Sequence, residues 1–152
     1  MTIIPFETSH DAAEPCGFNI ISDDKTLTFA TDLGFVSDKN LDYMKNSDFI
    51  VLESNYDLAM LNYGPYPYNL KRRIQGNLGH LSNDDTASTI LSLAKNNNKT
   101  DFLLAHLSEN NNMIDIAKQT IELFISQNDI DINNMNINFA TKTLSNEVYS
   151  VC

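Results

Sequence analysis

The sequence predicts an α/β fold in which a mixed sheet packs against flanking helices, and two observations carry this prediction. Short apolar or β-branched runs alternate along the chain with stretches whose apolar residues recur at helical spacing. The first two runs, residues 18–21 and 26–30, are separated only by a short polar turn, which predicts an antiparallel hairpin. Because the later strands alternate with helices, a layered α/β arrangement is expected.

The middle of the chain contributes a helix, a strand and a structured loop. Leu41 and Met44 lie at helical spacing and predict a helix over residues 38–45. The apolar run within residues 48–53 is typical of a buried strand. Prolines restrict their neighbours and lack a backbone donor, so residues 64–68 are expected to form a loop between two helical pieces.

The second half of the chain continues this alternation. Asn83 is a good cap for a helix with one apolar face, and Asn112 is a good cap for another. Residues 102–105 lie between these helices and predict a buried strand. Residues 136–139 and 147–151 alternate apolar and polar side chains, which predicts a terminal hairpin.

The composition is that of an acidic chain that can fold as one domain. Of its 152 residues, 42% are hydrophobic and 20% are charged, as in globular proteins. Ten Lys and Arg stand against twenty Asp and Glu, and the net charge of -10 disfavours sequence-blind attraction to nucleic acid or to an anionic membrane. A nucleic-acid role would therefore require a local basic patch or a bound metal.

The sequence also predicts a compartment and a redox state. No apolar run approaches the roughly 18 residues of a membrane span, and the N-terminus lacks the basic start and apolar stretch of a signal peptide. We therefore expect a cytoplasmic protein. Cys16 and Cys152 are too few for a disulfide scaffold and lack zinc-ligand spacing, so both are expected to be free thiols.

All three histidines fall in loops at the ends of predicted strands, where functional residues collect. Imidazole nitrogens and carboxylate oxygens suit zinc or manganese. His10, Asp32 and His106 fit as ligands that come from three strand ends, and a carboxylate can bridge two ions. The alternative for each residue is an ordinary hydrogen-bonding role in its own turn.

Seven sequence blocks follow one another between about residues 5 and 125. They are FETSHDAAEP (6–15), ATDLGFVSD (30–38), VLESNYD (51–57), GPYP (64–67), LKRRI (70–74), GHLSN (79–83) and LAHLS (104–108). In this order they resemble the YycJ family, also called WalJ, of metallo-β-lactamase-fold nucleases. The resemblance implies a metallo-β-lactamase-like αββα sandwich with a mixed sheet.

The resemblance also implies roles for single residues. It makes His10, Asp32 and His106 metal ligands, with Asp32 bridging two divalent ions, zinc or manganese. His80 stands in a block that resembles the catalytic-histidine segment of related enzymes, where it would give a proton to the leaving oxygen or hold a phosphate. Independently of the resemblance, Glu53 at a strand end is expected to orient the ligands, because metal ligands need such support, with a plain strand-end carboxylate as the alternative.

Two further groups are candidates for substrate binding. Two serines and an asparagine can offer neutral hydrogen bonds to phosphate, with helix capping as an equal alternative. Three consecutive cations form the dense basic cluster of the sequence and can contact a nucleic-acid backbone, with a solvated helix face as the alternative. The candidates are Ser82, Ser108 and Asn111, and Lys71, Arg72 and Arg73.

Members of the family are longer, and their N-terminal half carries a His-x-His-x-Asp-His motif that supplies most ligands of the first metal. Residues 1–152 do not contain this motif. We therefore expect the chain to be the C-terminal half of a metallo-β-lactamase-fold hydrolase domain, with half of the metal site at most. Strands such as residues 49–52 would then leave an apolar face uncovered, which predicts an N-terminal half as partner or self-association.

Together these features predict a metal-dependent phosphodiester hydrolase that resembles YycJ-type 5′ to 3′ DNA exonucleases, with DNA rather than RNA as partner and no membrane. One alternative keeps the fold and the metals but acts on RNA or on a small ester or phosphodiester. Another is a truncated remnant without catalysis. Activity on 5′-phosphorylated duplex DNA, compared with RNA and a generic phosphodiester, separates these hypotheses.

Overall fold

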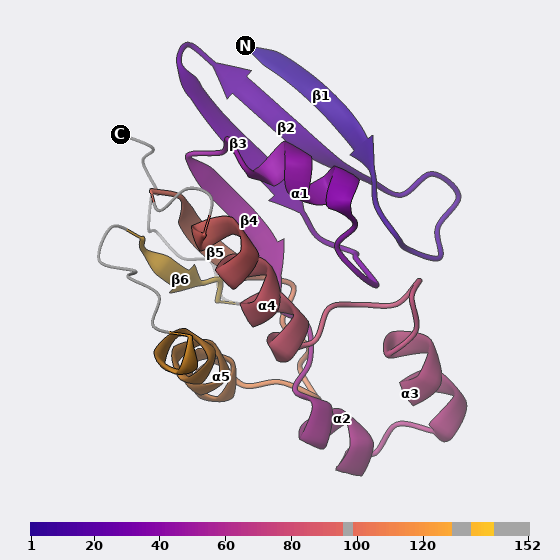
Figure 1. Ribbon diagram of the computed structural model, residues 1–152. Coiled ribbons are helices and arrows are strands. Elements are labelled where there is room, and N and C mark those ends of the chain that lie inside the picture. The colour runs from indigo at the N-terminus through magenta and orange to yellow at the C-terminus, as the bar shows by residue number, and fades with distance from the viewer. Residues whose placement is uncertain (96–98, 129–134, 142–152) are drawn as a thin grey trace.

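A mixed six-stranded sheet organises the protein in the computed structural model, which describes residues 1–95, 99–128 and 135–141. The strands lie side by side in chain order (Figure 1). The first three strands pair antiparallel, and the pairs from the third strand to the sixth are parallel. The strands are β1 (Thr2–Glu7), β2 (Cys16–Ser22), β3 (Lys25–Ala30), β4 (Phe49–Glu53), β5 (Asp101–Ala105) and β6 (Ile137–Phe139).

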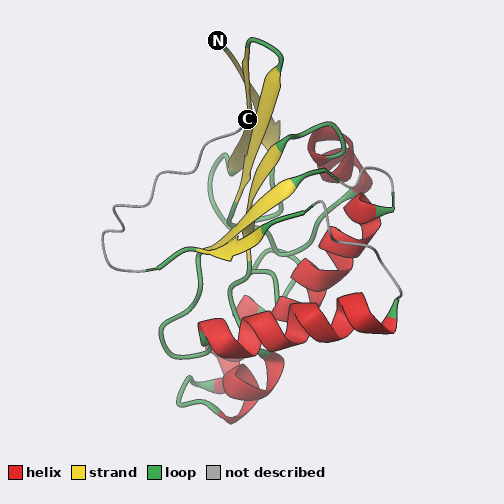
Figure 2. Ribbon diagram, turned by 90° about the vertical axis from the view of Figure 1, so that its left-hand side faces the viewer, coloured by secondary structure: helices red, strands yellow, loops and turns green. Residues whose placement is uncertain are grey.

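The helices gather on one side of the strands (Figure 2). One helix connects β3 to β4, three helices connect β4 to β5, and one follows β5. None of the helices in the described ranges has the length and apolar character needed to cross a bilayer. They are α1 (Asp38–Met44), α2 (Leu58–Tyr63), α3 (Tyr68–Ile74), α4 (Asn83–Ala94) and α5 (Ile114–Gln127).

The core lies between the parallel strands and the helices packed on them. Ile50 and Leu52 of β4 belong to one buried cluster with Phe102 and Leu104 of β5 and Ile90 of α4. All five residues of β4 are buried, and a strand that is buried on both faces reads as a continuous apolar run. Burial of each such side chain contributes about 1.5–3 kcal/mol, so the carboxyl ends of these strands are held by the most stable part of the fold.

The expectation that residues 49–52 leave an apolar face uncovered is wrong. All four side chains are buried, with exposed fractions between 0 and 7%. The exposed apolar side chains of the sheet lie on the antiparallel strands instead, where Ile3 is 52%, Phe18 37% and Phe29 41% exposed. Phe18 and Phe29 are direct cross-strand partners, so they form one aromatic patch on β2 and β3.

Within the described residues the predicted helices and strands are present, and strand β1 was not predicted. The hairpin of β2 and β3 is confirmed, as is the free, exposed thiol of Cys16. Strand β1 contains Pro5, which cannot donate to a ladder, and the sheet accepts it because β1 is an edge strand. Strand β6 lies within the predicted 136–139 segment but pairs parallel with β5. Its predicted partner, residues 147–151, lies outside the described residues, as does Cys152.

Asp48 joins the start of β4 to the start of β3. Its carboxylate accepts hydrogen bonds from the backbone N–H of Thr26 at 2.8 Å and from Lys25 Nζ at 3.3 Å. The bond from Thr26 is the main cause that lowers the pKa of Asp48, with the Lys25 ammonium adding to it. Since the folded pKa is lowered, the carboxylate stabilises the fold above the ordinary pKa of Asp, and this contribution is lost as the pH falls through the folded pKa.

We therefore predict that Asp48→Asn lowers the free energy of unfolding at pH 7 by about 1 kcal/mol. The difference between the two proteins is expected to shrink as the pH is lowered from about 5 to about 3. Urea denaturation at a series of pH values measures it. Asp42→Asn is the control, because Asp42 is 70% exposed and pairs only at the surface with Lys45. Equal pH profiles for the two variants would contradict the prediction.

Candidate metal centre

Four titratable side chains converge at the carboxyl ends of three parallel strands. Asp32 follows β3, Glu53 ends β4 and His106 follows β5. His80 reaches them from the loop between α3 and α4. One ligand atom from each of the four residues lies within 4.8 Å of the others. Because the carboxyl ends of parallel strands meet at one edge of a sheet, residues far apart in sequence are brought together there.

Asp32 is the point at which the three histidines meet. Its Oδ1 atom lies 3.6 Å from His10 Nε2, 3.8 Å from His80 Nδ1 and 3.7 Å from His106 Nδ1. The side chain of Asp32 is 46% exposed, so solvent and ligands can reach it. The structure therefore brings together all four residues that the sequence analysis placed in a metal or catalytic role.

Glu53 lies beneath this cluster and is fully buried. Its Oε1 atom is 2.8 Å from His80 Nδ1 and 2.6 Å from His106 Nδ1. Burial opposes ionisation of Glu53, but the hydrogen bonds to His106 and His80 outweigh it, and the pKa of Glu53 is lowered. The same hydrogen bond is the main cause that raises the pKa of His106. An ionised carboxylate only accepts, so both Nδ1 atoms donate to it and both Nε2 atoms remain free.

Two of the cluster residues have a left-handed backbone. The φ angle is 59° at Asp32 and 58° at His106, and in the described residues only Asp23 shares a positive φ among non-glycine residues. This conformation is uncommon for a residue with a side chain and costs about 1–3 kcal/mol. It turns both side chains out of the line of their strands at the point where the cluster forms.

His10 is oriented by the loop that carries His80. Its Nδ1 atom lies 2.9 Å from the carbonyl oxygen of Gly79, which only accepts, so Nδ1 carries the proton. The lone pair on Nε2 is then free on the side of Asp32. The backbone N–H of Asp11 donates to Leu78 and fixes the two loops at a second point.

The donor set fits a divalent metal ion. The side chains of Asp32, Glu53, His80 and His106 form one cluster of possible ligands, and His10 Nε2 lies beside it, 3.6 Å from Asp32 Oδ1. Within the cluster Glu53 is bonded to Nδ1 of His80 and of His106. A carboxylate bonded to the second nitrogen of a ligand histidine is the usual way in which proteins fix its tautomer and orientation. These residues could therefore hold a metal ion.

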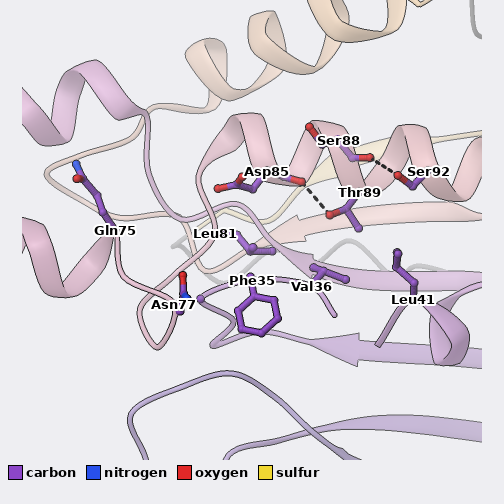
Figure 3. Close-up of a pocket in the computed structure, with 11 residues that line it drawn as sticks. Phe35, Val36, Leu41, Gln75, Asn77, Leu81, Asp85, Ser88, Thr89 and Ser92 are labelled. Carbon is purple, nitrogen blue, oxygen red and sulfur yellow. Dashed lines mark hydrogen bonds between the residues drawn. The ribbon is translucent and has the colours of Figure 1, made fainter. Parts of the chain in front are cut away.

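The loops that carry Asp32 and His80 pack against each other and line a cavity beside α4. A Cβ atom on Gly34 would lie within 2.2 Å of the carbonyl oxygen of Asn77, so only glycine allows this contact. The cavity has a volume of about 430 Å³ and includes the side chains of Phe35 and Asp85 (Figure 3). Its lining contains one carboxylate and no Lys or Arg, so it does not suit a phosphate.

The three neutral candidates have structural partners. Ser82, rather than the expected Asn83, caps α4, and its hydroxyl is bonded to the backbone and the side chain of Asp85 in a capping box. Ser108 accepts two hydrogen bonds from Asn111, which is 1% exposed. These contacts favour the capping and loop-closing alternative for all three residues.

The three cations of α3 differ in their surroundings. Lys71 donates to the carbonyl oxygens of Asn62 and Gly64 and so holds α3 to α2. Arg72 lies over the ring of Tyr68. Arg73 makes two hydrogen bonds to Asp11, the residue after His10, and this guanidinium lowers the pKa of Asp11.

Arg73 is therefore the cation that reaches the rim of the metal centre. No role was predicted for Asp11 from the sequence, although an acidic residue directly after a candidate ligand is a usable signal.

Comparisons with known proteins support a relationship to nucleases. No protein-family model matches the chain. It is 37% identical over 127 residues to exodeoxyribonuclease WalJ of Streptococcus pneumoniae, which covers 84% of this chain and 47% of that protein. It is also 37% identical over 122 residues to exodeoxyribonuclease YycJ of Bacillus anthracis, which covers 80% of this chain and 46% of that protein. The chain thus spans about half the length of these relatives.

Solved structures identify the fold. The metallo-β-lactamase fold protein YhfI of Bacillus subtilis matches with a TM-score of 0.62 at 16% identity, over 93% of this chain and 46% of that protein. Zinc-bound PqqB of Methylobacterium extorquens matches with a TM-score of 0.57 at 14% identity, over 94% of this chain and 50% of that protein. The chain therefore has the metallo-β-lactamase fold and is a homologue of the YycJ and WalJ proteins over about half of their length.

Proposed function

We propose that this chain carries one side of the metal centre of a phosphodiester hydrolase that acts on DNA. The observation that supports this most directly is the position of Asp32 Oδ1, which lies 3.6–3.8 Å from a ring nitrogen of each of three histidines. The choice of substrate rests on relatives at 37% identity that are named exodeoxyribonucleases. Duplex DNA with a 5′ phosphate is the substrate we propose.

The chain is, in this proposal, the C-terminal half of the catalytic domain. Matches that extend over 44–50% of the length of related proteins support a missing half. The exposed patch of Phe18 and Phe29 on the antiparallel part of the sheet gives that half an apolar surface to cover. A second copy of the chain is the other candidate for covering it.

The centre would hold divalent ions through His10, Asp32 and His106. Zinc or manganese bound there would polarise the phosphodiester and activate water as a nucleophile. In the complete centre Asp32 would be a ligand shared by both ions. Glu53 accepts a hydrogen bond from Nδ1 of His106, so Nε2 is the atom through which this ring would bind a metal.

His80 is the residue we propose as proton donor to the leaving oxygen. Its Nδ1 atom donates to Glu53, so the ring is held by one nitrogen and presents the other. Its side chain is 19% exposed, less than that of His106 at 44%, which suits a group that works from the wall of the site. In this role the ring would be an imidazolium: Nδ1 keeps its proton toward Glu53, and Nε2 gives its proton to the leaving oxygen and takes another from solvent after the product leaves.

Metal retention tests the centre before any substrate is chosen. After dialysis against limiting zinc or manganese, the chain is expected to keep about one ion, and Asp32→Ala is expected to keep none, because three rings lose their common partner. Elemental analysis of the purified proteins gives the ratio. Asp42→Ala, an exposed change of the same kind, is expected to behave as the parent chain. Equal retention by Asp32→Ala would overturn the assignment.

The basic cluster offers a second test with a matched control. Arg73→Ala is expected to weaken binding of a short, cleavage-resistant 5′-phosphorylated duplex about tenfold and to lower its salt slope by about one, since one phosphate contact is lost. Arg72→Ala changes the net charge equally but removes a side chain that lies over Tyr68. Fluorescence anisotropy over a range of salt concentrations compares them. If the two variants bind equally, Arg73 has no specific phosphate contact.

A further inference from the structure

Asn55 connects the two loops that carry His80 and His106. Its backbone N–H donates to the carbonyl oxygen of Leu81 at 2.9 Å, one residue after His80. Its own carbonyl oxygen accepts from the N–H of Ser108 at 2.8 Å. Its side-chain Nδ2 donates to the carbonyl oxygen of His106 at 2.8 Å. Asn55 thus makes one hydrogen bond to each end of the turn at residues 106–108 and a third to the loop that carries His80.

Asn55 is itself fixed by buried polar partners. It is 8% exposed, and its carbonyl oxygen also accepts from Asn112 Nδ2 at 3.1 Å. Asn112 is bonded in turn to Asn83, and Asn83 to Ser54. Satisfied buried networks of this kind are rigid, because each member that moves leaves a partner without a hydrogen bond.

His106 depends on its backbone more than the other histidines do. Its side chain is 44% exposed, against 15% for His10 and 19% for His80, so few packing contacts hold the ring. Its φ angle of 58° is unfavourable, so the backbone of His106 would relax to an ordinary conformation if its surroundings did not prevent this. The hydrogen bond from Asn55 acts on the carbonyl group of this very residue.

We infer that Asn55 is the positioning residue that keeps His106 in its left-handed conformation and so aims its ring at the metal centre. Asn55 does not touch the centre and acts only through His106. The consequence for metal binding rests on the proposed function, whereas the consequence for the His106 ring does not.

The test uses the full chain and a control of equal burial. Asn19 is also 8% exposed and also donates its Nδ2 to a backbone carbonyl, that of Tyr43 in α1. Asn55→Ala and Asn19→Ala are thus expected to lower the Tm similarly. Asn55→Asp keeps the size of the side chain but removes the donor, and it serves where Asn55→Ala fails to fold.

Two measurements separate positioning from general stability. In metal-free protein at constant pH, the ring ¹⁵N signals of His106 are expected to move toward those of free histidine in both Asn55 variants and to stay in place in Asn19→Ala. The affinity for zinc alone is expected to fall about 10–100-fold in the Asn55 variants only. Unchanged His106 signals, or an equal change in Asn19→Ala, would overturn the inference. If the parent chain binds no zinc, the proposed function fails, and the His106 signals still decide the role of Asn55.

Discussion

The buried carboxylate of Glu53 is the contact on which the arrangement of the site depends. Its Oε1 atom is shared by His80 and His106, and its Oε2 atom accepts from the backbone N–H of Leu33 at 2.8 Å and of Leu81 at 3.4 Å. A buried ion is costly unless its hydrogen bonds are satisfied, so none of these partners can leave without a penalty. One side chain at the end of β4 therefore fixes the loops after β3 and β5 and the loop before α4.

This dependence explains how the strained residues persist. Asp32 precedes Leu33, whose N–H is held by Glu53, and His106 has its carbonyl group held by Asn55. Hydrogen bonds to the end of β4 and the residues after it thus hold both positions, through the residue after Asp32 and through the carbonyl group of His106. The end of β4 is anchored in the core and keeps both residues in this unfavourable conformation. The exposed side chains of Asp32 and His106 are therefore pre-organised, although few packing contacts hold them.

The sequence predicts the elements better than their connections. The hairpin of β2 and β3 and the buried β4 follow from local patterns, because turn chemistry and apolar runs are properties of neighbouring residues. The parallel pairing of β6 with β5 and the edge strand β1 with its proline depend on distant partners, so local patterns do not show them. Similarly, the position of Glu53 at a strand end predicts that it lies near the site. Only the fold shows that its carboxylate is bonded to two histidines at once.

The convergence of the four candidate residues was predictable for a related reason. His10, Asp32, His80 and His106 stand in blocks whose order resembles a known family, and that order fixes which strand ends meet. For Ser82, which stands in one of these blocks, and for Asn111, the residue type does not decide the role, since a hydroxyl or amide beside a helix start serves capping as well as substrate. Asn55 was missed because its role lies in a backbone contact to His106, and no side-chain pattern records such a contact.

The acidic charge of the chain then limits how it can meet DNA. With a net charge of -10, with Lys71 bonded to backbone carbonyls and Arg73 paired with Asp11, the surface near the site offers little attraction to phosphate by itself. Bound ions are the largest local charges that such a site can gain. In the proposed enzyme, occupancy of the centre by metal, rather than the charge of the surface, thus decides whether a phosphodiester is held. In the proposed enzyme a phosphate at the centre would compete with Asp11 for Arg73, and substrate binding would then be coupled to the loop that carries His10.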